Sequence, residues 1–384
     1  MSTQEYQDAY MLERFSKSPE EFDTFYDNEL KQVVEELEAE RLKLVDPFKK
    51  LVKTYWIPVL IAAIAIAIID FSYLFLILFG LFIFAPVLKK NYKEFNQKRD
   101  ELAVRLKKEV LARTVRFMHP TFTYMPNHAV SRQEFIDAHI FADEFSTYKG
   151  DDYMTGAIGD DEQSTKVQLS EVSAERVMVS RDREGNVTRK AYSVFQGLFF
   201  VADFNKDFQG LTTVVPKEKE KSFLAQLFTK EDEAVLRPVE TMDLTFDETF
   251  TVKSSDEIKA RYILTPAFMK RLLDFSQKQR KNKVNQGAVT MDTLKDSVDM
   301  LVNRNRSRIT TEKAFIVPLE HAKSYFSFLD GKMYFMLHTG RKHFEFALHQ
   351  PIDKELFTEY YEDINRAMEL VDELNLNLRI WNKE

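Results

Sequence analysis

Apolar positions are concentrated in one stretch, residues 56–88, which is interrupted only at Asp70 and Ser72. A helix that crosses a membrane needs about 20 apolar residues, so this stretch is too long for one ordinary span. Lysines flank it on both sides, and flanking lysines tend to remain in the cytoplasm. The pattern predicts a transmembrane hairpin with spans at 51–69 and 71–88. One long tilted helix, or a hairpin that enters the membrane without crossing it, is the alternative.

Two amphipathic segments lie on either side of this stretch, at residues 19–50 and 89–118. Their apolar residues recur at helical spacing, and Ser18 followed by Pro19 and Glu21 is typical of a helix start. The first segment carries a net charge of −5 and the second a net charge of +6. Because opposite charges and facing apolar seams favour pairing, we predict an antiparallel helical stalk of the coiled-coil type. Two separate solvated helices, or homodimeric coiled coils, are the alternatives.

Residues 119–384 mix strand-like and helix-like patterns, which is typical of an α+β domain with an antiparallel sheet. Strands are expected at 167–179, 191–204, 211–215, 241–252, 313–317, 333–337 and 343–348, and helices at 131–148, 223–228, 266–278 and 353–374. We expect this part of the chain to form one cytoplasmic α+β domain, or two halves divided near residue 230. The polar residues 1–18 are expected to be a mobile N terminus.

Composition excludes several classes of function. The net charge of −7 argues against a nucleic-acid-binding protein, which carries an excess of basic residues. The chain has no cysteine, so disulfides, thiolate zinc sites, iron–sulfur clusters and cysteine nucleophiles are excluded. It also has no phosphate-binding glycine loop, nucleophile elbow, zinc-protease helix or kinase signature. The sequence therefore points away from an enzyme, and no cofactor is predicted.

One acidic segment is a candidate metal site. Residues 150–162 read GDDYMTGAIGDDE and predict a turn-rich loop that carries Asp151, Asp152, Asp160 and Asp161. Clustered carboxylates can hold Mg²⁺ or Ca²⁺ through oxygen ligands. The spacing of these aspartates departs from that of a calcium-binding loop, and a solvated acidic turn is the alternative.

Histidines provide two further candidates. His139 and Asp143 lie one helical turn apart, where the carboxylate could orient a general base, although a structural pair is the simpler interpretation. On the expected strand 343–348, His343, Glu345 and His349 would share one face and could bind zinc. A polar, solvent-facing side of an antiparallel strand explains the same residues.

Two basic runs, at residues 278–283 and 304–308, could contact anionic lipid headgroups at a membrane surface. The candidate residues are Lys278, Arg280, Lys281, Lys283, Arg304, Arg306 and Arg308. Because the chain is acidic overall, a solvated helix end and a solvated loop are the alternative interpretation.

Four segments carry a resemblance to a known family. They read GDDYMTGAIGDDE, LSEVSAERV, VFQGLFFVADFNKDFQGLTTVVP and ARYILTPAFMKRLLDF. Together with the arm–hairpin–arm order of the N-terminal part, the chain resembles a bacterial family of membrane proteins known as domain of unknown function 3137. The resemblance extends from about Phe22 to the hairpin near His343. It implies a membrane-anchored bacterial protein, but it implies no agreed activity, substrate or catalytic residue.

These patterns together predict a multi-pass protein of the bacterial cytoplasmic (inner) membrane with both termini in the cytoplasm. We expect a non-catalytic binding or scaffold module whose partners are membrane lipid and a protein, with no nucleic acid among them. The alternative is a divalent-metal-assisted enzyme that acts at the membrane surface through the acidic segment 151–162. The ligand, the protein partner and the oligomeric state do not follow from the sequence.

Overall fold

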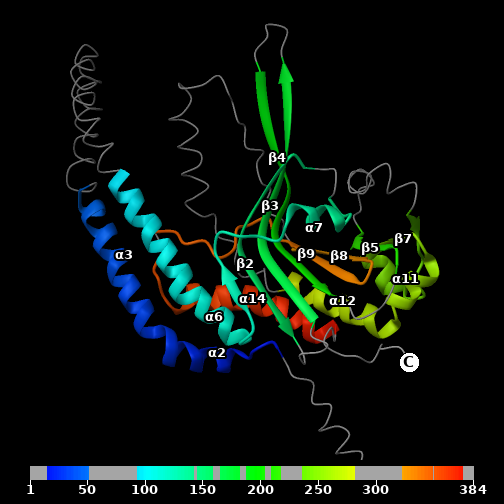
Figure 1. Cartoon of the computed structure of the whole chain (residues 1–384), viewed down its shortest axis with the longest axis horizontal. Coiled ribbons are helices and arrows are strands. Elements are labelled where there is room, and N and C mark those ends of the chain that lie inside the picture. Colours follow the sequence, from blue (N-terminus) through cyan, green and yellow to red (C-terminus); the bar gives the residue numbers. More distant parts are fainter. Residues whose placement is uncertain are drawn as a thin grey trace, which may run out of the picture. The chain divides into compact units, whose positions relative to one another are not determined.

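The computed structural model describes residues 15–51, 93–141, 145–158, 165–181, 187–203, 209–217, 236–281, 322–348 and 350–374. The chain divides into two compact units. The helical unit contains Lys17–Phe117 and Glu345–Glu362. The sheet unit contains Met1–Ser16, Met118–Phe344 and Asp363–Glu384. Figure 1 shows the elements of each unit, coloured along the chain.

The helical unit begins with a continuous helical stretch made of α2 (Pro19–Phe25), η1 (Tyr26–Leu30) and α3 (Lys31–Leu51). The stretch starts at Ser18 as its sequence predicts. The Ser18 hydroxyl accepts a hydrogen bond from Glu21 N at 3.2 Å, and the Glu21 carboxylate accepts one from Ser18 N at 2.7 Å. This capping box satisfies two backbone N–H groups that the first turn of a helix leaves without helical partners.

A second helical stretch runs antiparallel to the first. It comprises residues 93–106, η4 (Lys107–Leu111) and α6 (Ala112–Met118). Phe117 stacks on Phe25 with ring centroids 4.2 Å apart, and Arg105 Nη1 lies 2.5 Å from Glu40 Oε1. Phe25 precedes Glu40 in the first stretch, whereas its partner Phe117 follows Arg105 in the second, so the two stretches run in opposite directions. Because Arg105 and Glu40 are both exposed, their ion pair contributes at most about 1 kcal/mol, and apolar packing is the main stabilising contribution.

The sheet unit is built on one antiparallel sheet. Nine described strands form it in the order β1-β2-β3-β4-β9-β8-β5-β7-β6. Their bounds are β1 (Thr123–Met125), β2 (Thr147–Ile158), β3 (Thr165–Arg181), β4 (Val187–Asp203), β5 (Leu211–Pro216), β6 (Arg237–Pro238), β7 (Phe250–Ser254), β8 (Lys323–Leu329) and β9 (Lys332–His338). β5 pairs with β7 and β8, so strands before and after residue 230 belong to the same sheet.

Helices cover both faces of this sheet. The helices of the sheet unit are α7 (Arg132–Asp137), α10 (Leu244–Thr249), α11 (Glu257–Ile263), α12 (Pro266–Lys281) and the part of α14 (Lys354–Leu374) from Asp363 onwards. On one face, Phe135 of α7 packs on the ring of Phe199, with centroids 5.4 Å apart. On the opposite face, Phe275 of α12 packs on Phe335, with centroids 5.2 Å apart. The aromatic residues thus form cores on both sides of the strands.

The predicted transmembrane hairpin is corrected here. In the part of the chain that the structure describes, no helix is long and apolar enough to cross a membrane. This finding contradicts the membrane-spanning fold class and the multi-pass inner-membrane localisation, and both are withdrawn. The predicted spans at 51–69 and 71–88 lie outside the described residues except for Leu51, which ends α3.

Two sequence predictions in the sheet unit are wrong about where a helix starts or ends. The expected strand 241–252 begins instead with α10, because the Asp243 carboxylate accepts hydrogen bonds from Thr245 N and Phe246 N and caps that helix. The expected helix 131–148 ends at Asp137, and His139 has a positive φ of 51° that a helix does not tolerate.

The hairpin expected after the strand 333–337 was also misplaced. The expected return strand 343–348 is not a strand, and Phe344 has a φ of 51°. The hairpin that the structure contains joins β8 to β9 through Asp330 and Gly331, whose φ angles are 46° and 78°. Two positive φ angles give the turn a twist that matches the strands, and Asp-Gly is a common choice for it. The segments expected at 223–228 and 313–317 lie outside the described residues.

Candidate metal centre

Two carboxylates face each other across β2 and β3. In the antiparallel register, Asp151 of β2 is the direct partner of Glu171 of β3. Directly opposed residues of an antiparallel pair lie on the same face, with their Cβ atoms about 5 Å apart. Val172, the next residue on β3, belongs to the core cluster beneath α7. Since neighbouring residues on a strand point to opposite faces, Glu171 and Asp151 lie on the face away from α7.

A β-bulge brings a third carboxylate to the same place. The register shifts between Asp151 and Met154, so that Asp152 and Tyr153 together oppose a single residue of β3. In a regular strand, Asp152 would point away from Asp151. The bulge redirects it: Asp152 has a φ of 54°, and its N–H donates to Pro126 O at 3.1 Å instead of to β3.

Gly150 is required next to the bulge because the backbone is crowded there. A Cβ atom on Gly150 would lie 2.6 Å from Ala129 Cβ and 2.7 Å from Glu171 O. Only glycine allows β2 to approach β3 this closely. The GDD triplet at 150–152 is therefore a structural unit, in which glycine provides space and the two aspartates provide carboxylates.

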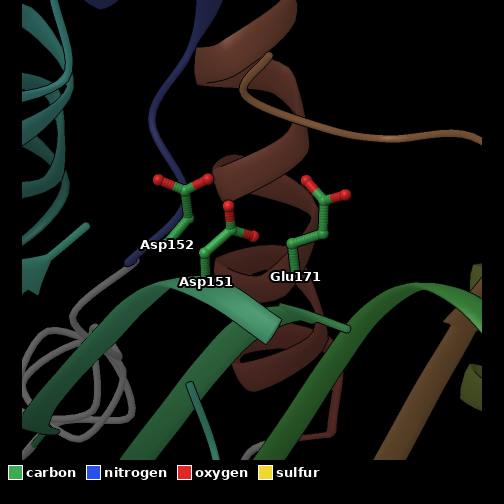
Figure 2. Close-up of side chains that lie close together, drawn as sticks. All are labelled: Asp151, Asp152 and Glu171. Carbon is green, nitrogen blue, oxygen red and sulfur yellow. The ribbon is translucent and has the colours of Figure 1, made fainter. Parts of the chain in front are cut away.

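The three carboxylates can each direct one oxygen to a common point (Figure 2). One oxygen atom from each of Asp151, Asp152 and Glu171 lies within 4.8 Å of the other two. Asp152 and Glu171 are buried, and Asp151 is partly buried. Two oxygens on opposite sides of a calcium ion, at about 2.4 Å each, are about 4.8 Å apart. The spacing thus fits three ligands of one ion.

Further hydrogen bonds fix two of these side chains. The Tyr124 hydroxyl, on β1, donates to Asp152 Oδ1. Glu171 Oε2 accepts a hydrogen bond from the backbone N–H of His343 at 2.8 Å. Partners of this kind hold ligand oxygens in position before an ion binds, which reduces the ordering that binding requires.

His343 links the carboxylates to a buried charged cluster. Its Nδ1 lies 2.6 Å from Asp363 Oδ2, and its Nε2 lies 2.7 Å from the Thr339 hydroxyl. A neutral imidazole satisfies both contacts if Nδ1 donates to Asp363 and Nε2 accepts from Thr339. Burial lowers the pKa of His343, and the nearby positive charges of Arg341 and Arg366 lower it further, although Asp363 opposes the shift.

Asp363 is held in its charged form. Burial alone would raise the pKa of its carboxyl, but the charge interaction and the hydrogen bond with His343, together with the charges of Arg341 and Arg366, outweigh burial and lower that pKa. Arg341 Nη2 lies 3.2 Å from Asp363 Oδ1, and Arg366 Nη1 contacts the same oxygen. A carboxylate with these partners is ionised at neutral pH.

Oxygen-only ligands select a particular class of metal. Carboxylates are hard ligands, and they suit Ca²⁺, Mg²⁺ and Mn²⁺ better than zinc or copper, which favour nitrogen and sulfur. Three carboxylates also bring up to three negative charges to one point, so a divalent cation is favoured over a monovalent one. The arrangement can bind and hold such a cation.

The structure brings together two of the four metal candidates from the sequence. Asp151 and Asp152 both contribute to the cluster, whereas Asp160 and Asp161 lie outside the described residues. Residues 150–158 of the predicted loop are not a loop, because they belong to β2. The third ligand, Glu171, was missed. The sequence does contain a signal for it. Glu171 is two residues after Leu169 and four after Val167, so it lies on the same face of β3 as these two buried residues.

The other sequence candidates do not converge. Among the described residues, no second group of three potential metal ligands lies close enough to share an ion. His343 is committed to Asp363 and Thr339, and His349 and Asp143 lie outside the described residues. Of the proposed lipid-contact residues, Lys278, Arg280 and Lys281 belong to the end of α12, and Lys283, Arg304, Arg306 and Arg308 lie outside the described residues.

Comparison with known families gives one match. Residues 193–306 and 315–376 match a family model described as protein of unknown function (DUF3137). The matched segments include His343 and Asp363, whereas Asp151, Asp152 and Glu171 precede them. No curated protein and no solved structure matches the chain.

Proposed function

The chain belongs to the DUF3137 family of proteins of unknown function, and we propose that its sheet unit is a non-catalytic module that binds one divalent cation. The observation that carries this proposal is the convergence of Asp151, Asp152 and Glu171 within 4.8 Å on a face of the sheet. The ligands come from two strands and a bulge, which are rigid elements. A site on such elements keeps its geometry better than a site on a loop.

Electrostatics supports a cation at this place. Like charges directly opposite each other on paired strands destabilise a sheet, and Asp151 and Glu171 are such a pair. Asp152 adds a third carboxylate through the bulge. A divalent cation bound to all three would attract each carboxylate, and the folded state would become more stable when the ion is present.

A metal-assisted enzyme is the second candidate, because the cluster adjoins a histidine. The backbone of His343 contacts Glu171, and a His–Asp pair could serve as a general base. However, both ring nitrogens of His343 already have partners, Asp363 and Thr339, and the ring is fully buried. A base that cannot reach a substrate proton does not catalyse its transfer, so cation binding without catalysis is the better supported function.

Cation binding predicts a rise in thermal stability with Ca²⁺ or Mg²⁺. After dialysis of the full chain against a chelator, we expect added Ca²⁺ to raise the melting temperature. At a concentration 100 times the dissociation constant, the stabilisation is about 2.7 kcal/mol, which corresponds to roughly 5–10 °C for a domain of this size. Circular dichroism at increasing temperature measures the shift.

Charge-neutral variants of the ligands give the control. Glu171→Gln keeps an oxygen that accepts the hydrogen bond from His343 N but removes the negative charge. Asp151→Asn removes the negative charge of the opposing residue on β2. We expect both variants to lose most of the calcium-dependent shift. Glu248→Gln, an exposed residue on α10, should keep all of it. An equal shift in Glu171→Gln and the unmodified chain, or no shift in either, would refute the proposed site.

A further inference from the structure

The β3–β4 pair extends beyond the strands on either side of it (Figure 1). β2 pairs with β3 only as far as Glu175, and β9 pairs with β4 only from Gly197 onwards. Within the part of the chain that the structure describes, residues 176–181 and 187–192 therefore pair with each other alone. These two segments are called the β-arm below. The arm is a two-stranded ribbon, and no described strand pairs with either of its outer edges.

Large apolar side chains of the β-arm are exposed. The exposed fractions are 51% for Met178, 61% for Val179 and 38% for Tyr192. Met178 and Tyr192 lie on one face of the ribbon and Val179 on the other, because residues alternate along a strand and paired residues share a face. Exposed apolar groups gathered on one protruding element are typical of interaction surfaces.

The charge of the β-arm is opposite to that of the chain. The described arm carries four basic residues, Arg176, Arg181, Arg189 and Lys190, and no acidic residue, whereas the whole chain has a net charge of −7. Arg181 and Arg189 are exposed and share one face with Val179. A partner that fits this surface therefore combines acidic and apolar side chains.

The backbone of β3 offers hydrogen bonds along the outer edge. The N–H of Val177 points away from β4, because it donates to Ser146 Oγ at 2.8 Å. In an antiparallel pair, the N–H groups of alternate residues point to the same side. The N–H groups of Val179 and Arg181 therefore point to that outer edge as well. β2 does not extend to either residue.

We propose that the outer edge of β3 in the β-arm binds an extended acidic segment of a partner protein by strand addition. In this mode, backbone hydrogen bonds provide affinity and alternate side chains provide specificity. Acidic side chains of the added strand would lie on the face that carries Arg181 and Arg189, and its apolar side chains would lie on the other face and cover Met178. Nucleic acid fits the surface less well, because half of the described side chains on the arm are apolar and offer nothing to phosphates.

A labelled model peptide tests this proposal on the full chain. The probe is a fluorescein-labelled decapeptide of alternating glutamate and valine, and its binding is measured by fluorescence anisotropy in the presence of a chelator. The chelator keeps the result independent of the proposed cation site. We expect saturable binding that weakens as salt is added. A decapeptide of alternating lysine and valine should not bind.

Two pairs of variants separate the contributions of backbone and charge. Val179→Pro removes one outward N–H, and proline is tolerated where that N–H faces solvent, so the β3–β4 pairing is retained. We expect about a tenfold loss of affinity, against about a twofold loss for Val179→Ser, which keeps the N–H. The double variant Arg181→Glu, Arg189→Glu should also lose at least about tenfold. The double variant Lys166→Glu, Arg237→Glu changes the net charge equally at exposed sites outside the arm and should bind normally.

Three results would overturn the proposal. Equal affinities of Val179→Pro and Val179→Ser would exclude strand addition. Binding of a single-stranded oligonucleotide, but not of the acidic peptide, at the same arginines would assign the arm to nucleic acid. Self-association of the Arg181→Glu, Arg189→Glu variant, together with no peptide binding by the unmodified chain, would mean that the arginines only protect an open edge from aggregation.

Discussion

Replacing Asp363 by asparagine is expected to lower the free energy of unfolding by about 3–5 kcal/mol, because it breaks a buried charge pair on one side only. Asp363 is 1% exposed, and its carboxylate contacts His343 and forms ion pairs with Arg341 and Arg366. The neutral amide leaves the two arginine charges without their counter-charge. Urea titration followed by circular dichroism measures the loss. Asp203→Asn, at the exposed end of β4, should change stability by less than about 0.5 kcal/mol.

The same cluster predicts a pH dependence. The pKa of Asp363 is lower in the folded chain than the ordinary value of about 3.9, so its contribution to stability is complete above that pH and is lost as the pH falls further. The pKa of His343 is also lowered by folding, so its contribution is complete above about pH 6.5 and decreases in more acidic solution. We expect the free energy of unfolding to fall below pH 6.5 in both the unmodified chain and Asp363→Asn. The additional fall below pH 4 should be smaller in Asp363→Asn. An identical pH profile for the two proteins would contradict the role given to Asp363.

Replacing Phe135 by alanine is expected to cost about 3–5 kcal/mol of stability. The Phe135 ring is fully buried, and its centroid lies 5.2 Å from that of Phe145, 5.6 Å from that of Phe195 and 5.4 Å from that of Phe199. Helix α7 has six residues, which is too short for a stable isolated helix, so packing of this ring holds it on the sheet.

Thermal and urea unfolding of Phe135→Ala measure that cost. Gln133→Ala, on the exposed side of the same helix, is the matched control and should remain within about 0.5 kcal/mol of the unmodified chain. A small loss in Phe135→Ala, comparable to that of the control, would mean that α7 contributes little to the core and that the aromatic contacts are replaceable.

Elements with a strong local signal were predictable from the sequence. The helix start at Ser18 follows from a serine, a proline and acidic residues in sequence, and the structure contains the full capping box. β3 and β4 follow from long runs of β-branched and aromatic residues, and the strand expected at 211–215 is β5, which extends one residue further to Pro216.

Elements that depend on competing local signals were missed. The acidic and glycine-rich composition of residues 150–158 suggested a loop, yet pairing with β3 and β1 imposes strand geometry on it. Asp-Gly at 330–331 is a common hairpin turn, but the sequence pattern predicts no strand before it at 323–329 and predicts one at 343–348 instead. The position of such a hairpin turn depends on which strands pair on either side of it.

The candidate metal centre could be predicted only in part. Two neighbouring aspartates were visible in the sequence, but a regular strand would have placed Asp151 and Asp152 on opposite faces. Only the bulge, which depends on pairing with β3, puts them on one side. Glu171 joins them through strand register, a relation between residues twenty positions apart that a single sequence does not specify.

Terbium luminescence tests cation binding at this cluster most directly. Tb³⁺ prefers oxygen ligands as Ca²⁺ does, and Tyr124, whose hydroxyl donates to Asp152, lies close enough to transfer excitation to an ion held there. We expect emission that saturates at one ion per chain, is displaced by Ca²⁺, is lost in Glu171→Gln and is retained in Glu248→Gln. Emission that does not saturate, or that is equal in the two variants, would contradict a cation site at Asp151, Asp152 and Glu171.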